Sequence, residues 1–337
     1  MESPRSFTIV ADTTGPLADF GPYVASIDGR GRVAFCASVR SGGTGIFLAA
    51  DGSVERLASS GELVRGFTSH PDVAADGSWC AYAELSTGEP ALVGGRAGRV
   101  EVVDTGAVFA RIGPLGPTMN DAGDIAFRAD AAAGVSGVFL RRLGAAVVSV
   151  ADTASVVAFE GLPVVDEHRT VVYRAELPGG VQAIRASDGR TTATLADTTT
   201  SFAELGRFPC AAAGRVAFTA RRRDGRTGVF VAGSRAPGAP GVPDEPALAV
   251  DTTGAFKSVR GALVDDRGAV VFFGTPRGGS LGIHDSGARP ILAIGDRAFG
   301  STVVDFALNP VSINAPGQLA IRVTLANGVQ LVVRADP

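Results

Sequence analysis

A short unit recurs along the chain, and this recurrence limits the possible folds more than any other feature of the sequence. In the copy at residues 27–35, Asp28 is followed by Gly31 and then by the alternating run Val33-Ala34-Phe35. An Asp side chain bonds to the backbone two residues on, and glycine takes the positive φ that a side chain opposes, so each copy predicts a tight turn into a strand. The last apolar residues of the copies are at 35, 82, 127, 173, 218, 272 and 321, so seven units spaced 45 to 54 residues apart fill the chain.

Each unit contains further segments that are typical of β-strands. We call the last apolar residue of each copy its marker, and the tight turn before it the corner. About ten residues after the marker comes a Gly-x-Phe strand, as at residues 45–48, 137–140 and 228–231. The next strand ends in Asp-Thr in most units. A short strand, often entered through a proline, precedes each corner. The period of two inside each unit excludes helical repeats. Four antiparallel strands repeated seven times predict an all-β, seven-bladed β-propeller.

The two ends of the chain are expected to share one blade. The last unit ends near residue 334 without an outermost strand of its own, whereas residues 6–10 precede the first unit. The N-terminal strand is therefore predicted to close the last blade, which leaves no sheet edge open. A linear β-solenoid is the alternative, and it is disfavoured because solenoids have shorter coils and polar caps.

This architecture predicts a single domain, residues 1–337. A Pro-Gly segment at 233–243 accounts for the longest spacing and is interpreted as a tolerated insertion on the rim that carries the corners. The blade cores are expected near residues 20–58, 66–104, 112–152, 160–197, 206–251, 258–296 and 305–334, with residues 6–10 as the closing strand.

The corners resemble the tandem NxxGxxAF repeats of bacterial proteins that are predicted to be β-propellers. The likeness covers nearly the whole chain, and four of the seven copies keep Asn or Asp followed three residues later by glycine. The resemblance implies a propeller fold and a bacterial protein, but no particular activity. Members of that family are often exported and tethered at the surface, whereas this sequence shows neither an export signal nor an anchor.

Charge and hydropathy narrow the possible partners. The chain has 31 Lys and Arg against 34 Asp and Glu, a net charge of -3, so nothing in its overall charge favours nucleic acid or an anionic membrane surface. Residues 144–159, the most apolar stretch, fall short of the ~20 residues that a membrane-spanning helix requires. The three cysteines, Cys36, Cys80 and Cys210, form no CxxC pair and favour a reducing compartment. We therefore expect a cytoplasmic monomer.

The strand order brings two sets of loops to one rim of the predicted torus, and propellers usually bind ligands near the axis of such a rim. One set joins each outer strand to the next inner strand, and the other joins the second and third strands of a blade. The polar and charged candidates of the first set are Asp19, Tyr23, Arg65, His70, Arg111, Glu160, Glu204, Arg207, Lys257, Arg260 and Asn309.

Three arginines, Arg128, Arg174 and Arg322, occupy equivalent places just after the marker in three blades. They could converge on an anionic group such as a carboxylate through bidentate bonds. The alternative, which we favour, is structural ion pairing with Asp130, Glu176 or the recurring aspartates, because a buried arginine requires a partner. The remaining binding candidates are Arg207, Arg260 and Glu160.

The aspartates that precede threonine near the strand ends at 12, 104, 152, 197 and 251 are interpreted as turn formers rather than as a cation-binding ring. The histidines lie in different blades, which disfavours a metal site, and no P-loop or HExxH motif is present. Neither a metal nor a cofactor is therefore predicted. His70 and Tyr23 are the best candidates for proton transfer, although a single loop histidine is more often merely solvated.

Two functions stay open at this point. The first is a binding or interaction propeller whose polar axial pocket accepts a small molecule, peptide or protein. The alternative is a metal-independent enzyme of the lyase or cyclase type, with His70 or Tyr23 transferring a proton and the three arginines stabilising negative charge. An apolar-walled axial cavity with a His or Tyr near an Arg would favour catalysis, and a shallow funnel would favour protein binding.

Overall fold

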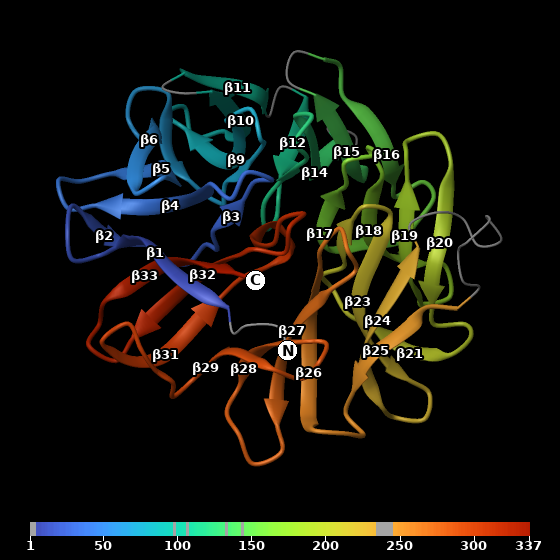
Figure 1. Cartoon of the computed structure of the whole chain (residues 1–337). Helices are drawn as coiled ribbons and strands as arrows, with labels where there is room; N and C mark the ends of the chain where they lie inside the picture. The colour runs from blue at the N-terminus through green and yellow to red at the C-terminus, as the bar shows by residue number, and fades with distance from the viewer. Residues whose placement is uncertain (1–4, 97–98, 106–107, 132–133, 143–144, 234–244) are drawn as a thin grey trace.

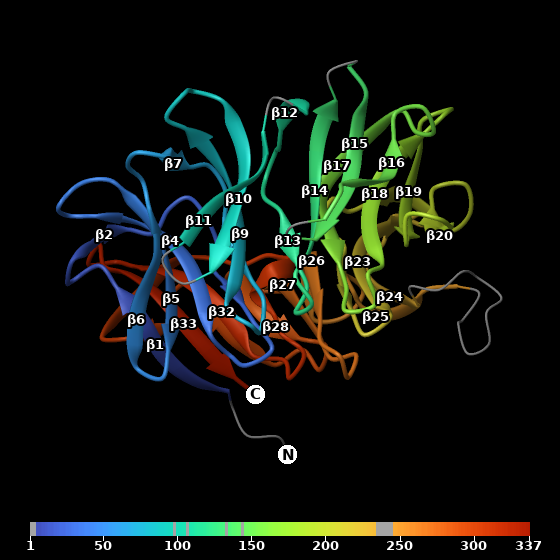
Figure 2. The same cartoon turned by 90° about the horizontal axis from the view of Figure 1, so that it is seen from above.

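The strands form seven separate antiparallel sheets around a common centre, as Figures 1 and 2 show. The computed structural model describes residues 5–96, 99–105, 108–131, 134–142, 145–233 and 245–337. Within these residues the only helical element is the short 3-10 turn η1 (Pro310–Ser312). The predicted insertion at 233–243 lies, apart from its first residue, outside the described residues. The chain is thus an all-β, seven-bladed propeller.

The first four blades follow one another along the chain, each from its inner to its outer strand. Blade 1 holds β2 (Leu17–Asp19), β3 (Ser26–Ile27), β4 (Val33–Val39), β5 (Thr44–Ala50) and β6 (Ser53–Ser59). Blade 2 holds β7 (Val64–Phe67), β8 (Asp72–Val73), β9 (Ser78–Leu85), β10 (Pro90–Arg96) and β11 (Arg99–Thr105). Blade 3 holds β12 (Phe109–Ile112), β13 (Thr118–Met119), β14 (Asp124–Ala131), β15 (Ser136–Arg142) and β16 (Val148–Asp152). Blade 4 holds β17 (Ala158–Val165), β18 (Val171–Leu177), β19 (Val181–Ser187) and β20 (Thr192–Asp197).

The last three blades repeat this order. Blade 5 holds β21 (Phe202–Leu205), β22 (Cys210–Ala212), β23 (Arg215–Arg222), β24 (Thr227–Gly233) and β25 (Ala247–Asp251). Blade 6 holds β26 (Phe256–Val264), β27 (Val270–Pro276), β28 (Gly282–Asp285) and β29 (Pro290–Ala293). Blade 7 holds β30 (Arg297–Ala298), β31 (Ser301–Ala307), β32 (Leu319–Leu325), β33 (Gln330–Asp336) and β1 (Ser6–Asp12).

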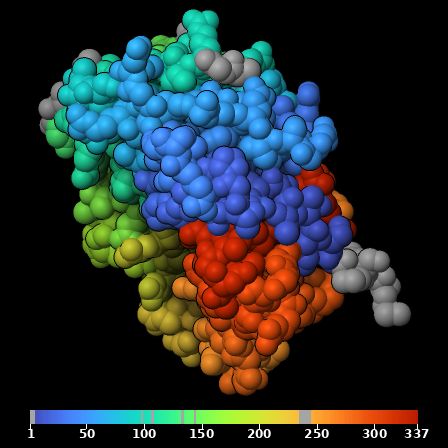
Figure 3. Space-filling model, turned by 90° about the vertical axis from the view of Figure 1, so that its left-hand side faces the viewer, coloured from blue at the N-terminus to red at the C-terminus, as the bar shows by residue number. Residues whose placement is uncertain are grey.

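The N-terminal strand closes the ring. β1 pairs antiparallel with β33, from Ser6 opposite Asp336 to Asp12 opposite Leu331. Figure 3 shows the N-terminal part of the chain directly against the C-terminal part on the surface. Each blade therefore has four antiparallel strands, and the inner one is split into two segments in blades 1, 2, 3 and 5. In blade 7 the two-residue β30 pairs in addition with the inner strand β31, and the outer strand comes from the start of the chain.

The recurring corners are Asx turns, as predicted, in blades 1, 4 and 6, where the Asp side chain accepts a bond from the N–H two residues on. In blades 3 and 7 the Asn side chain accepts from the N–H four residues on, and blades 2 and 5 have neither Asp nor Asn at this place. In blade 1, Asp28 Oδ1 accepts hydrogen bonds from the backbone N–H groups of Arg30 (3.0 Å) and Arg32 (2.9 Å), and Gly31 has φ +79°. Blade 4 keeps the aspartate but has Arg169, at φ +63°, in the place of the glycine. The corner side chains also join blades, because the Asn314 amide donates to the Asp28 carbonyl at 2.8 Å. The corners therefore form the turns and fasten each inner strand to the next blade.

The marker of blade 2 was predicted one residue too late. Ala81 pairs with Val93 as Phe35 pairs with Phe47 in blade 1, so Ala81, not Tyr82, is the equivalent residue. The misassignment came from the run Trp79-Cys80-Ala81-Tyr82, in which either register places an aromatic residue on the inner face. Tyr82 instead occupies the place that Arg128 takes in blade 3, and its hydroxyl accepts a hydrogen bond from the Arg128 N–H at 3.2 Å.

The aspartates that precede threonine form turns at four of the predicted places. Asp12, Asp152, Asp197 and Asp251 each accept a bond from the N–H two residues on. For Asp104, the residue two positions on lies outside the described residues, and its carboxylate forms an ion pair with Arg141 of the neighbouring blade at 2.6 Å. The buried aspartate of blade 2 thus balances a charge from blade 3.

Aromatic rings pair at equivalent places in blades 1, 3 and 5, and a histidine joins a phenylalanine at this place in blade 6. Pairs of phenylalanines from the second and third strands pack with ring centroids 5.7 to 6.0 Å apart, namely Phe35 with Phe47, Phe127 with Phe139 and Phe218 with Phe230. In blade 6, His284 takes this place against Phe272 at 5.9 Å and Phe256 at 4.9 Å. His284 is buried, and neither of its ring nitrogens has a hydrogen-bond partner within the part of the chain that the structure describes.

The substitution His284→Phe is expected to raise the free energy of unfolding by about 1–2 kcal/mol at about pH 8, because it removes two unsatisfied buried nitrogens. Burial lowers the pKa of His284, so below about pH 6.5 the unfolded chain takes up a proton that the folded protein resists. Wild-type stability should therefore fall on acidification, and the advantage of the variant should grow. Urea unfolding at slightly alkaline and mildly acidic pH measures both effects.

The matched control is Phe47→His, which places the same group in the same environment of blade 1. It is expected to destabilise the protein, more so at acidic pH. Equal stability of wild type and His284→Phe at both pH values would contradict the interpretation.

Candidate functional site

The seven inner strands surround an axial cavity of about 780 Å³. Each blade contributes at least one residue to its lining: Tyr23, His70, Leu115, Leu162, Arg207, Arg260 and Asn309 come from blades 1 to 7 in that order. These residues lie on the inner strands or in the segments that interrupt them, and in blades 4 and 6 the inner strand is irregularly paired with the second strand at this level. Five of the eleven loop candidates predicted from the sequence line the cavity.

His70 lies in the wall of this cavity in neutral form. It is 4% exposed, and its Nε2 lies 3.1 Å from the Pro117 carbonyl oxygen, to which the N–H donates. Burial lowers the pKa of His70 to about 4. The ring fits only because the neighbouring residue is Gly116, where a Cβ would lie 2.3 Å from the imidazole Cε1. The predicted loop histidine is therefore a packed and hydrogen-bonded group, not a solvated one.

Tyr23 is half-buried in the segment between β2 and β3, and burial raises its pKa. Asn309 has a structural task as well, since its Oδ1 accepts a bond from the Val311 N–H at 3.0 Å and caps η1. At neutral pH both side chains are uncharged. They give the cavity a hydroxyl and an amide without adding charge.

The charge of the cavity comes from two arginines. Arg260, an exposed residue on β26, stacks over the Phe273 ring with its guanidinium carbon 5.7 Å from the ring centroid. Arg207 has a side chain that is 71% exposed, and its Nε lies 3.2 Å from a carboxylate oxygen of Glu160. Stacking on an aromatic ring and a single ion pair leave other N–H groups of both guanidiniums available to a ligand.

Arg128, Arg174 and Arg322 do not line the cavity. Arg174 is 5% exposed and ion-paired with Glu160, its direct cross-strand neighbour, so Glu160 serves Arg174 and Arg207 together. Arg128 donates to the Gly161 carbonyl at 3.2 Å, and Arg322 lies 4.0 Å from Asp305.

The expected partners of these arginines were wrong. Asp130 pairs instead with Arg111 at 2.8 Å, and the cross-strand register gives Arg174 to Glu160 rather than to Glu176. The register depends on the bulge in β17, which the sequence did not reveal.

The other loop candidates lie outside the cavity. Three exposed ion pairs at equivalent places join the inner to the second strand, namely Arg65 with Glu84, Arg111 with Asp130 and Arg221 with Glu204. Asp19 accepts a bond from the Gly21 N–H at 2.9 Å. Lys257 is exposed on the same rim.

A second cavity, of about 110 Å³, lies further along the same inner strands, at the mouth that the corners surround. Its lining includes the carboxyl groups of Asp72, Asp121, Asp166, Glu167 and Asp266. Sequence reasoning assigned the corners to turns and overlooked this cluster. The available signal was the position directly after the corner residue, which is acidic in blades 3, 4 and 6.

Among the described residues, no group of three or more His, Cys, Asp or Glu side chains has an arrangement that could hold a metal ion. The same residues contain no helix of the length and apolar character needed to cross a membrane.

Solved structures with low sequence identity share this fold. The chain is similar to a prolyl endopeptidase (11% identity, TM-score 0.57) and to a puromycin-hydrolyzing peptidase of Mycobacterium tuberculosis (12% identity, TM-score 0.57); each match covers 93% of this chain and 50% of the other. It is also similar to a chain of the mitotic checkpoint complex, with 13% identity, a TM-score of 0.51, and coverage of 99% and 92%. The chain spans about half the length of the two peptidases.

No curated protein matches the chain. A family model does, and it covers residues 8–331, which is nearly the whole ring from the closing strand to β33. The protein therefore belongs to the family of unknown function DUF7453.

Proposed function

We propose that the protein is a binding propeller whose axial cavity accepts a small molecule or peptide with an apolar body and an anionic group. The observation that carries this proposal is the cavity of about 780 Å³, in which apolar walls meet two accessible arginines. Ligand sites are typically concavities of about 300–1,000 Å³ with apolar walls and a few polar groups that orient the ligand.

The chemistry of the lining supports an anionic ligand. A carboxylate can receive two parallel N–H bonds from one guanidinium, and the Arg260 guanidinium lies over the Phe273 ring with its carbon 5.7 Å from the ring centroid. Leu115 and Phe208, which are 43% and 41% exposed, line the same cavity and would cover an apolar ligand body. Tyr23 and Asn309 supply uncharged groups that select the orientation.

Proton-transfer catalysis is the weaker hypothesis. A general acid or base works best when its pKa lies near the working pH, whereas burial holds the pKa of His70 at about 4 and raises that of Tyr23. Within the described residues, no hydrogen bond joins His70 or Tyr23 to an arginine. These observations favour retention of a ligand over its turnover.

The proposal also covers the cellular location, the oligomeric state, the need for a cofactor and the type of repeat. We propose a cytoplasmic monomer that needs no cofactor and whose corners are of the NxxGxxAF type. The net charge of -3 and the closed ring of sheets support this part.

A panel of N-acetyl dipeptides with apolar side chains and free carboxylates, together with the matching amides, tests the binding proposal by thermal shift and calorimetry. Carboxylates are expected to bind and amides are not. Arg260→Ala and Arg207→Ala should each weaken binding by about 10- to 100-fold, the value of one charge-assisted interaction of about 1.5–3 kcal/mol.

Lys257→Ala is the matched control, because it removes a positive charge from the same rim outside the cavity. Its affinity should stay within about twofold of the wild type, an energy of less than about 0.5 kcal/mol. Equal binding of acids and amides, or equal losses in all three variants, would contradict the assignment.

A further inference from the structure

The cavity at the corner mouth is a second place where blades converge, and it is independent of the function proposed above. Its acidic lining comes from blades 1, 2, 3, 4 and 6, with Asp28 from blade 1, whereas the first cavity is charged by arginines. At about 110 Å³ it is much smaller than typical drug-sized pockets, yet it has room for several waters or one small polar group.

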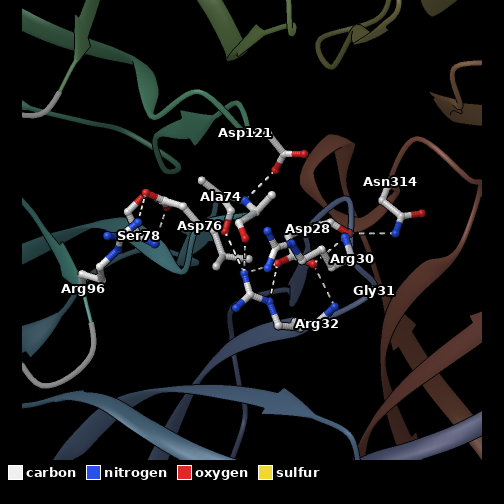
Figure 4. Close-up of polar contacts among 12 residues, drawn as sticks. Asp28, Arg30, Gly31, Arg32, Ala74, Asp76, Ser78, Arg96, Asp121 and Asn314 are labelled. Atoms are coloured by element: carbon white, nitrogen blue, oxygen red, sulfur yellow. Dashed lines mark hydrogen bonds and ion pairs between the residues drawn. The ribbon is translucent and has the colours of Figure 1, made fainter.

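Backbone hydrogen bonds from a neighbouring blade hold three of the carboxylates at this mouth. Asp72 Oδ2 accepts from the Met119 N–H at 2.7 Å. Asp121 Oδ1 accepts from the Ala75 N–H of the preceding blade at 2.7 Å, an arrangement that Figure 4 shows beside the corner of blade 1. The Glu167 carboxylate accepts from the Asp121 N–H at 3.0 and 3.2 Å. Because each bond crosses between blades, the rigid ring fixes the spacing of the negative charges.

The carboxyl groups at this mouth repel one another. Burial first, and then the neighbouring carboxylates, raise the pKa values of Asp121 and Glu167, with Asp266 among the charges that act on Glu167. Asp72 is buried, and burial together with Asp121 and Glu167 raises its pKa to about 8. Arg30 is the cation that acts on Asp121, and Arg32 is already ion-paired with Asp28.

Asp166 gives an independent indication of a ligand. It lines the cavity, is only 3% exposed, and uses Oδ1 to accept from the His168 and Thr170 N–H groups at 2.9 and 2.8 Å. Its other oxygen, Oδ2, has no hydrogen-bond partner within the described residues. A buried carboxylate oxygen without a donor is unfavourable, and a donor supplied by a ligand would remove the penalty.

We propose that this mouth binds an organic cation through a primary ammonium or guanidinium head group. Several N–H donors that point in different directions match carboxylates that stand on different blades. A metal ion would need its oxygen ligands within one coordination sphere of about 2.0–2.6 Å, and the carboxylates of Asp72, Asp121, Asp166 and Glu167 already accept bonds from backbone N–H groups.

The test is calorimetric titration of the full chain with agmatine, putrescine and Mg²⁺ at equal ionic strength. Agmatine or putrescine is expected to bind with one-to-one stoichiometry, and Mg²⁺ is not. Asp266→Asn and Glu167→Gln should each weaken binding by at least about tenfold, because each removes one charge from the mouth.

Asp166→Asn is the most informative variant. Asn120 and Asn314 fill the same corner position in blades 3 and 7, where Oδ1 keeps the turn and the amide donates to the next blade. The variant should therefore fold at least as stably as the wild type, yet lose agmatine binding by more than about tenfold.

Asp51→Asn is the matched control, since Asp51 is an exposed carboxylate in a turn that does not line the cavity. It should leave the affinity unchanged. The proposal would be overturned if neither amine bound, or if Mg²⁺ bound as tightly as the amines. It would also be overturned if Asp51→Asn weakened amine binding as much as Asp166→Asn does. Because the dipeptide experiment probes the other cavity, failure of one site leaves the other testable.

Discussion

Replacement of Gly161 by alanine is expected to lower the free energy of unfolding by about 3–5 kcal/mol. Gly161 lies in the bulge of β17 at φ +72°, and a Cβ there would lie 1.6 Å from the Arg207 carbonyl oxygen of blade 5. The positive φ and the backbone collision act together, because the carbonyl belongs to another blade and moves only if the two blades separate. Urea unfolding of wild type and variant measures the loss.

Gly179→Ala separates these two effects. Gly179 has φ +83°, but nothing lies within 4 Å of the position of its Cβ. This control should cost only the conformational penalty, about 1–2 kcal/mol. If the two variants lost equal stability, blades 4 and 5 would not be in close contact at this level. Because Arg207 follows the same backbone, Gly161→Ala should also weaken ligand binding at the axial cavity.

Deletion of residues 1–12 is expected to cost about 5 kcal/mol or more and to promote association between chains. The deletion removes β1, which pairs with β33 at six positions. Each hydrogen bond that is lost lowers the free energy of unfolding by a net amount of about 1 kcal/mol. It also leaves β33 as an unpaired edge, and such edges recruit strands from other molecules. Thermal unfolding and light scattering report the two consequences.

The control for this deletion is a chain that lacks residues 1–4 only, so that β1 (Ser6–Asp12) stays whole. It should unfold at the wild-type temperature. A chain lacking residues 1–12 that kept wild-type stability would show that closure through β1 contributes little to the ring.

Much of the fold was accessible from the sequence because its determinants are local. An Asx turn such as that of Asp28 needs only its own aspartate and a nearby glycine, so the corners, the blade number and the closing strand could be predicted. The Ala81 register was missed where two apolar residues compete for one position. Placement of loops on one rim was enough to nominate Tyr23, His70 and Arg260 for the cavity.

The partners of the site residues depend on distant contacts. Glu160 pairs with Arg174 because of a bulge, and His70 is buried because Gly116, in another blade, leaves it space. The acidic mouth was missed since each corner, taken alone, is explained by its turn. Only the closed ring shows that Asp72, Asp121 and Glu167 act on one another.

The pairing of β1 with β33 has a consequence for the order of events during protein synthesis. β1 is synthesised long before β33 and cannot find its partner until β33 has been made, roughly half a minute later at typical elongation rates of about 5–20 residues per second. Until then the nascent chain carries an unpaired β-strand, as well as blades stacked on one side only. Demand for chaperones should therefore be greatest just before β33 becomes available for pairing.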